Sequence, residues 1–351
     1  MDQLIGSQIG NRLESDPRKR SGACYQITAL LGKQTGRRTY LATHCKMKAA
    51  VVIKLVLFGP DFTWSDLKLF ERESETLKSL HHSAIPNYLD SFEVETPIGK
   101  GFALVQTYIE AQSLQQQVTA GRTFSTQNLH ELATQVLNIL TYLHDRHPPV
   151  IHRDIKPSNI LLTYAPNGDV KDLYLVDFGS VKTTPSNGTM TIVGTYGYMP
   201  IEQFSGRALP ASDLYSLGAT LIYLATSKHP AELVQTNLQL DFEQHTVLPL
   251  ELMKWLKQLT YTDLSSRPRS AKEALRTLKK RSIYPKDTAS PNSKKSIQSY
   301  LLSKTKLGKS TIASPAVIAA YGMILVLTFS VDVAFGLCLL ILAPVFIFPH
   351  K

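Results

Sequence analysis

Cysteine is scarce in this sequence of 351 residues, and the three cysteines are scattered at Cys24, Cys45 and Cys338. They show neither the paired spacing of a zinc site nor the even number of a disulfide framework. The scarcity excludes a metal-stapled or disulfide-stapled protein and favours a reducing, cytosolic environment.

A secretory signal and internal repeats are also lacking. The first ten residues are only weakly apolar, and the basic run Arg18–Arg20 follows them instead of preceding them. We therefore expect residues 1–24 to be a flexible N-terminal tail. The remaining length allows a bilobal enzyme of about 250 residues with appendages.

Acidic and aromatic residues are nearly absent between Lys279 and Lys309, where nine Lys or Arg residues face one acid, Asp287. Most of the formal net charge of +10 therefore lies in this stretch. An arm that binds nucleic acid needs aromatic side chains for base stacking. We interpret residues 283–314 as a basic, solvated linker and expect no nucleic-acid partner.

Charge is almost missing from residues 315–349, which contain only Asp332. An apolar run of this length predicts a membrane region. One helix would reach about 50 Å, well beyond the hydrocarbon thickness of about 30 Å. Two short spans that meet at Asp332 keep the carboxylate at the far interface, so we expect a two-span hairpin. The alternative is one span with an interfacial helix.

The rest of the chain divides into a strand-rich part and a helix-rich part. Short apolar runs separated by turns cover residues 25–108, with one helix expected near 66–80. Apolar residues then recur at spacings of three and four over 125–144. Further helices are expected at 213–226, 249–259 and 271–278. This order indicates an α+β protein.

Two motifs point to chemistry. The first runs Ile151-His152-Arg153-Asp154-Ile155-Lys156-Pro157-Ser158-Asn159, and the second is Asp177-Phe178-Gly179. With them the sequence resembles the protein kinase family, in particular the bacterial eukaryotic-like (Hanks-type) serine/threonine kinases. The resemblance implies a bilobal kinase domain over 25–282, with a small β-rich N-lobe (25–106), a hinge (107–110) and a larger helical C-lobe (111–282).

The resemblance also implies roles for these residues. Asp154 is the expected catalytic base, and Lys156 is expected to neutralise the γ-phosphate of ATP. Asn159 and Asp177 are the expected ligands of Mg²⁺, with Mn²⁺ as an alternative.

Upstream, Val51-Val52-Ile53-Lys54 matches the strand whose lysine contacts the α- and β-phosphates and pairs with a helix glutamate. Counting back from the His81–Ile85 turn selects Glu73 over Glu71 and Glu75 as that partner.

The phosphate loop, Leu31–Ala42, matches the family in length but not in glycines. Gly32 holds the first glycine position, whereas Arg37 holds the third. We expect Gly32 and Thr39 to contact ATP. Arg37 or Arg38 is hypothesised to compensate with charge for the missing glycines.

In the hinge, Thr107 and Ile109 are expected to bind adenine through main-chain atoms, with Gln106 as gatekeeper and Leu161 as a further ATP contact. Thr195 is placed near the protein substrate.

Three expected contacts brace the substrate side. Glu202 is expected to pair with Arg267, and Asp213 to anchor the catalytic loop. Arg153 suggests regulation by a phosphate on the preceding loop, whose hydroxyl residues are Thr183, Thr184, Ser186, Thr189 and Thr191.

The leading hypothesis is a Ser/Thr kinase that acts on proteins, autophosphorylates and is anchored to a membrane with its kinase domain in the cytoplasm. A pseudokinase or ATP-binding scaffold is the alternative, because the phosphate loop is poor in glycine. A small-molecule phosphotransferase is disfavoured by the peptide platform around Thr195 and Glu202. A dimer is neither indicated nor excluded.

Overall fold

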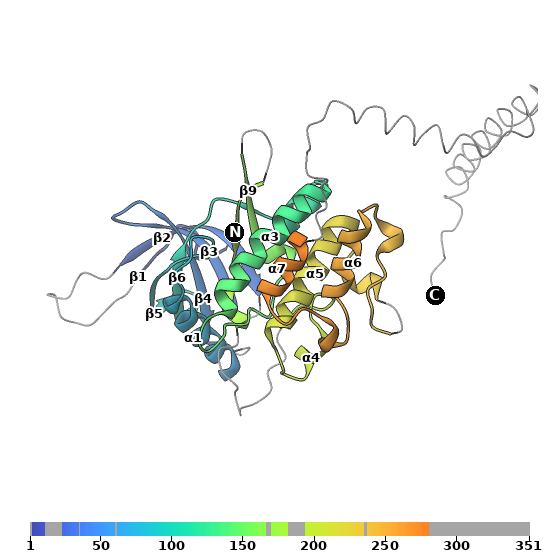
Figure 1. Ribbon diagram of the computed structural model, residues 1–351. Helices are drawn as coiled ribbons and strands as arrows, with labels where there is room; N and C mark the ends of the chain where they lie inside the picture. Colours follow the sequence, from blue (N-terminus) through green and yellow to red (C-terminus); the bar gives the residue numbers. More distant parts are fainter. Residues whose placement is uncertain are drawn as a thin grey trace, which may run out of the picture. The chain divides into compact units, whose positions relative to one another are not determined.

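The computed structural model of the chain describes residues 2–10, 23–34, 36–59, 62–165, 170–181, 194–234 and 237–280. Its longer strands gather on one side of this part of the chain and most of its helices on the other (Figure 1). A small β-rich lobe with one main helix precedes a larger helical lobe. The expected two-lobed α+β architecture is therefore confirmed.

The first lobe is built on a six-stranded antiparallel sheet in the order β1-β2-β3-β4-β6-β5. Its strands are β1 (Gln8–Gly10), β2 (Cys24–Gln34), β3 (Arg37–His44), β4 (Ala50–Leu57), β5 (Tyr88–Thr96) and β6 (Gly99–Thr107). Side chains alternate between the two faces of a sheet. In β4 this alternation buries Val51, Ile53 and Leu55 in one core and turns Lys54 to the opposite face.

The N-terminal residues Asp2–Gly10 belong to this lobe, so the expectation of a flexible tail over residues 1–24 is wrong for them. β1 pairs with β2, and the Gly6 N–H donates to the Ile27 carbonyl at 3.0 Å. Leu4 is completely buried and Ile9 nearly so, both in the apolar core on one face of the sheet. Two apolar residues give no periodic pattern, which is why the sequence did not reveal them.

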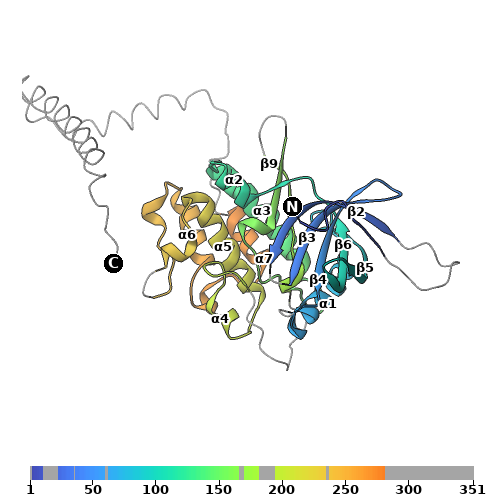
Figure 2. The same ribbon diagram turned by 180° about the vertical axis from the view of Figure 1, so that it is seen from behind.

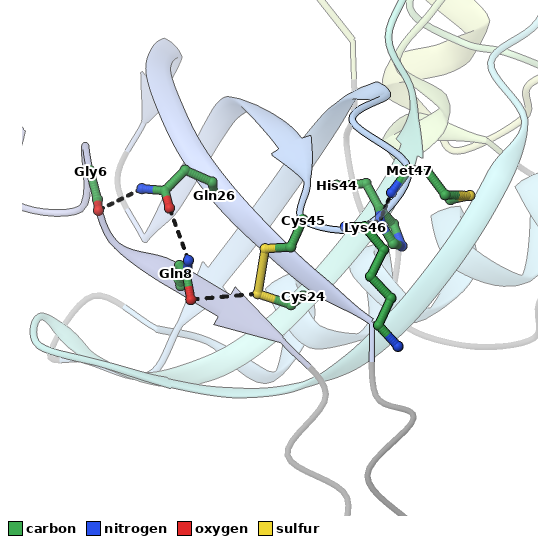
Figure 3. Close-up of a disulfide and its surroundings, with 8 residues drawn as sticks. All are labelled: Gly6, Gln8, Cys24, Gln26, His44, Cys45, Lys46 and Met47. Carbon is green, nitrogen blue, oxygen red and sulfur yellow. Dashed lines mark hydrogen bonds between the residues drawn. A yellow bond between two sulfur atoms is a disulfide. The ribbon is translucent and has the colours of Figure 1, made fainter.

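A disulfide joins Cys24, at the start of β2, to Cys45, which follows β3 (Figure 3). The two Cα atoms lie 5.4 Å apart, and the Cys45 N–H donates to the Cys24 carbonyl at 2.8 Å. The interpretation of the cysteines as unpaired is therefore wrong for these two. Strand register, which the sequence alone does not give, places the residues side by side.

The helix of the first lobe, α1 (Trp64–Ser79), begins with a capping box. The Thr63 hydroxyl accepts from the Asp66 N–H, and the Asp66 carboxylate accepts from the Thr63 N–H at 3.1 Å. Helical spacing buries Glu73 among apolar residues of the inward face. The helix thus carries one carboxylate into the interior of the lobe.

The second lobe is mostly helical. Its helices are α2 (Leu114–Thr119), α3 (Thr126–His144), α4 (Ile201–Phe204), α5 (Pro210–Thr226), α6 (Leu250–Leu259) and α7 (Ala271–Lys280), with 3₁₀ turns at Pro157–Asn159, Phe178–Ser180, Pro230–Leu233, Glu243–His245 and Leu264–Ser266. α5 is buried from Ala211 to Leu224 and packs against α3, α6 and α7 (Figure 2). The four helices expected in this lobe are confirmed, whereas α2 was not expected.

A second sheet has the order β7-β8-β9, with strands β7 (Gln112–Ser113), β8 (Ile160–Tyr164) and β9 (Val170–Leu175). β8 and β9 pair antiparallel with Ile160 opposite Leu175. Since β8 follows Asn159 and β9 precedes Asp177, this register brings the two chemical motifs to the same end of the sheet. Residues 166–169, which connect β8 to β9, lie outside the described residues.

Within the described residues, no helix is both long enough and apolar enough to cross a membrane. Residues 283–314 and 315–349, interpreted from the sequence as a linker and a membrane region, lie outside those residues.

Candidate active site

One buried carboxylate holds the loop between α3 and β8. Asp213 on α5 is completely buried, and it accepts hydrogen bonds from the N–H groups of His152 at 2.9 Å and Arg153 at 2.8 Å. The His144 ring at the end of α3 lies 3.0 Å from the same carboxylate. Arg153 has a φ of 71°, a conformation that persists only where the surroundings fix it. These contacts set the backbone that leads into Asp154.

Asp154, Lys156 and Thr195 form a polar cluster. The Thr195 hydroxyl donates to Asp154 Oδ1 at 2.7 Å, and Lys156 Nζ donates to the Thr195 oxygen at 2.7 Å. Lys156 Nζ also lies 2.8 Å from Asp154 Oδ2. The two oxygens of Asp154 are therefore contacted separately, Oδ1 by Thr195 and Oδ2 by Lys156.

Lys54 lies between two carboxylates from distant parts of the chain. Its ammonium forms an ion pair with Glu73 on α1 and donates to Asp177 Oδ1 at 2.7 Å. Burial would lower the pKa of Lys54, but Asp177 and Glu73 raise it above its ordinary value. The Lys54 charge in turn holds the pKa of Asp177 far below its usual range, against the effect of burial. Burial raises the pKa of Glu73, and Lys54 opposes that rise. Lys54 and Asp177 are therefore ionised at neutral pH.

The turn at Asp177-Phe178-Gly179 packs closely against α1. A Cβ at Gly179 would lie 3.0 Å from Glu73 Oε2, so glycine leaves the room that this approach needs. Phe178 is buried and meets the His152 ring edge to face, with ring centroids 4.9 Å apart. Asp177 has a φ of 68°, which turns its carboxylate toward Lys54.

Two oxygen donors fit a hard cation. The Asn159 amide nitrogen donates to the Asp154 carbonyl at 2.8 Å and to Asp154 Oδ2 at 3.1 Å, which leaves the Asn159 carbonyl oxygen as its possible ligand atom. Asp177 is ionised beside Lys54. Carboxylate and amide oxygens suit Mg²⁺ or Mn²⁺, so the residues present fit the expected metal.

The β2–β3 hairpin places Gly32 opposite Thr39, and Thr39 opposite Lys54 on β4. Residues paired across neighbouring strands share a face of the sheet. Gly32 and Thr39 therefore lie on the same face as Lys54, as their expected role at ATP requires.

Both arginines of this hairpin are engaged by carboxylates. Arg37 Nη2 lies 3.0 Å from Asp66 Oδ1, and Arg38 Nη1 lies 2.7 Å from Asp2 Oδ2. Alternation along β3 places Arg37 on the face of Lys54 and Arg38 on the opposite face. Of the two arginines, it is Arg37 that shares a face with the expected ATP contacts.

The hinge follows β6. The Thr107 N–H donates to the Asn87 carbonyl at 3.0 Å, and the Ile109 carbonyl accepts from the N–H two residues later at 2.9 Å. Gln106 is buried at the end of β6, and Leu161 is half-buried in β8. The Thr107 carbonyl and the Ile109 N–H stay the main-chain groups that we expect to bind adenine.

Glu202 and Arg267 form a bidentate ion pair, with N–O distances of 2.7 and 3.0 Å, in which the Arg267 side chain is completely buried. The Ser212 hydroxyl donates to Glu202 at 2.7 Å, and the Gln203 amide donates to the Arg153 carbonyl at 2.7 Å. The segment around α4 is thus tied both to α5 and to the catalytic loop. Sequence reasoning identified the ion pair but assigned no role to Ser212, which precedes Asp213, or to Gln203, which follows Glu202. The hydroxyl residues of 183–191 lie outside the described residues.

The two-lobed fold and these clusters are typical of phosphotransferases, and comparisons with known proteins specify the family. The protein kinase domain model matches residues 25–299. Serine/threonine-protein kinase B of Synechocystis sp. is 32% identical over 274 residues, which cover 72% of this chain and 46% of that protein. Serine/threonine-protein kinase PknA of Nostoc sp. is 34% identical over 224 residues, which cover 60% of this chain and 38% of that protein.

The chain belongs to the protein kinase family, and the expected branch of bacterial serine/threonine-protein kinases is confirmed by these relatives. The family as a whole uses ATP and a divalent metal. The chain spans less than half the length of the curated relatives that it matches.

Proposed function

We propose that the chain transfers the γ-phosphate of Mg·ATP to Ser or Thr hydroxyls of proteins. The observation that carries the proposal is the simultaneous assembly of two clusters. Lys54 is held between Glu73 and Asp177, while Asp154 is in contact with Lys156. The first cluster orients a nucleotide, and the second acts on an acceptor hydroxyl.

In the transfer step, the oxygen of the substrate hydroxyl attacks the γ-phosphorus and ADP leaves. Asp154 accepts the proton that this hydroxyl loses. Lys156 stabilises negative charge on the phosphoryl group, for which its ammonium already lies beside Asp154. Thr195 bonds to both side chains and positions the acceptor. Lys156 and Thr195 are residues of Ser/Thr-type kinases, which supports a Ser/Thr acceptor over Tyr.

Lys54 binds the α- and β-phosphates while Glu73 holds its ammonium in place. Gly32 and Thr39 cover the nucleotide, and the Thr107 carbonyl and Ile109 N–H bind the adenine edge. Leu161 contacts the base from β8. Asn159 and Asp177 would hold Mg²⁺, which when bound neutralises charge on the phosphates.

The test is transfer of radiolabelled phosphate from ATP by the full chain, to itself and to an added protein substrate. Asp154→Asn should abolish transfer while leaving the melting temperature near that of the wild type. Asp145→Asn is the matched control, since Asp145 makes a surface ion pair with Lys272. A wild-type chain that melts cooperatively and binds Mg·ADP but transfers no phosphate would overturn the proposal.

That same outcome would support the pseudokinase, whose motivation is the phosphate loop poor in glycine. The presence of Lys54, Asp154, Asn159 and Asp177 together argues against it, because a scaffold that only binds ATP does not need the catalytic base Asp154. A small-molecule phosphotransferase is disfavoured by the Glu202–Arg267 brace beneath the segment of Thr195.

We also propose that residues 315–349 anchor the chain to a membrane as a two-span hairpin, with the kinase domain in the cytoplasm. The apolar run with its single charge, Asp332, and the basic stretch before it support this. Fractionation of the full chain and of a chain ending at residue 314 tests it. Recovery of both in the soluble fraction would contradict the anchor.

A further inference from the structure

Arg37 stands where the family has the third glycine of the phosphate loop, and the fold gives this arginine a carboxylate partner on another element. β3 register places it opposite Val56, on the face of the sheet that carries Lys54. Its Nη2 donates to Asp66 Oδ1 at 3.0 Å, and both side chains are about one-quarter exposed, 29% and 27%. The backbone is held as well, because the Leu57 N–H donates to the Gly36 carbonyl at 3.0 Å.

Asp66 is itself fixed. Its second carboxylate oxygen accepts from the Thr63 N–H at 3.1 Å and from the Thr63 hydroxyl at 2.7 Å. It therefore belongs to the capping box that starts α1. Burial opposes ionisation of Asp66, but the bonds from Thr63 and the charge of Arg37 keep its pKa below the ordinary value. The acceptor of Arg37 is thus ionised and firmly attached to the helix.

α1 transmits this contact to the catalytic centre. Asp66 and Glu73 are seven residues apart, so they lie on the same face of the helix, two turns from each other. Glu73 at the other end of this stretch pairs with Lys54. The charge of Arg37 also reaches Glu73, whose pKa it helps to lower against the effect of burial.

We propose that Arg37 is a positioning residue that ties the β2–β3 hairpin to α1 through Asp66. The hairpin, which covers the nucleotide, and the helix, which sets Lys54 through Glu73, then move together. A glycine at this position leaves a hairpin free to adjust to the phosphates. Arginine replaces that freedom with an ion pair. The inference rests on the proposed function, since it assigns the hairpin to ATP.

The alternative role for Arg37 is direct contact with the phosphates. The two roles predict opposite effects of the substitution Asp66→Asn on nucleotide binding. If Arg37 acts through Asp66, removing either charge loosens the hairpin, so Arg37→Gln and Asp66→Asn both weaken nucleotide binding. If Arg37 binds phosphate directly, Asp66→Asn releases it toward the nucleotide and tightens binding.

The experiment measures the Kd of Mg·ADP and the KM and kcat for ATP with the full chain in detergent. Arg37→Gln and Asp66→Asn should each raise Kd and KM about two- to fivefold, the range of a partly exposed ion pair, with little change in kcat. The Kd of the double variant should not exceed the larger of the two single-variant Kd values, because the second substitution has no interaction left to remove. Arg37→Lys should recover part of the loss.

Two controls separate the ion pair from other effects. Arg38→Gln removes the neighbouring arginine from the opposite face and should leave Kd within about 1.5-fold. Thr63→Ala removes the cap but keeps the ion pair, and it should affect helix stability more than Kd. Hydrogen exchange adds a readout that needs no turnover: Arg37→Gln should speed exchange in both the hairpin and the first turn of α1.

The proposal is overturned if Asp66→Asn tightens binding, if the two single effects add in the double variant, or if Arg38→Gln equals Arg37→Gln. Failure of the proposed function is distinguishable, because a chain that binds Mg·ADP without transferring phosphate still reports the Kd values and exchange rates of every variant.

Discussion

Leu4 offers the sharpest test of the fold, because a flexible tail and an ordered segment predict different outcomes. Its side chain is completely buried against the apolar core on one face of the first-lobe sheet. The segment precedes residues 25–299, the part matched by the family model. If the segment is part of the lobe, Leu4→Ala creates a cavity, and if it is a tail, the substitution has no effect.

The expected loss of unfolding free energy in Leu4→Ala follows from the burial of the Leu4 side chain. Replacing a fully buried leucine by alanine costs about 2–5 kcal/mol, and the cost falls when neighbours can collapse into the space. Leu4 lies near a chain end held by hydrogen bonds such as that from Gly6 to Ile27, so some relaxation is available. We expect a loss of about 3 kcal/mol in the free energy of unfolding, or about 6–12 °C in Tm for a domain of this size.

Urea unfolding followed by tryptophan fluorescence measures this loss, with Ile5→Ala as the matched control. Ile5 is the next residue of the segment and is 37% exposed, so its truncation should cost less than about 0.5 kcal/mol. Equal midpoints for Leu4→Ala, Ile5→Ala and the wild type would refute the argument that the segment completes the core.

Two further predictions concern the same lobe. Reducing the Cys24–Cys45 disulfide, or replacing Cys45 by Ser, should lower stability by about 3 kcal/mol, because the bond closes a loop with a sequence separation of 21. Unchanged urea midpoints after thiol titration has demonstrated reduction would contradict this. Burial, followed by the charges of Asp90 and Tyr88, raises the pKa of Tyr25 to about 12. The contribution of the neutral Tyr25 side chain to folding stability should be fully present below the unfolded pKa of about 10 and be lost as pH rises toward 12. Tyr25→Phe should therefore flatten the decline in stability over that window, and identical slopes for both proteins would count against it.

Local motifs account for what the sequence predicted. Asp154, Asn159 and Asp177 stand in short segments whose order is enough to suggest their chemistry. The helices of 125–144 and 213–226 were predicted because an apolar face repeats every three to four residues. These features depend on neighbours in the sequence, so a single chain displays them.

Contacts set by register and packing were not predictable in the same way. Cys24 meets Cys45 because β2 and β3 are neighbours, and Asp2 meets Arg38 because the N-terminal segment packs on this lobe. The contact of Gln203 could not be predicted, because a polar residue beside Glu202 is equally compatible with a solvated turn. The contact of His144 was indicated only weakly, by a polar side chain at the end of the apolar face of its helix.

The buried charges of the site constrain position more than they add stability. Lys54 joins residues 19 and 123 positions away in sequence, and Arg267 joins one 65 positions away. Taking such groups out of water costs about as much as their attraction returns, whereas removing one partner leaves a buried charge that costs about 3–5 kcal/mol. Of these ion pairs only that between Lys54 and Asp177 joins the two lobes, and because the Asp177 side chain is 46% exposed, solvent reduces the cost of separating it. The ion pairs therefore fix Lys54 beside Glu73 and Asp177, and Glu202 beside Arg267, so the catalytic geometry is built from charges that join distant segments of the chain.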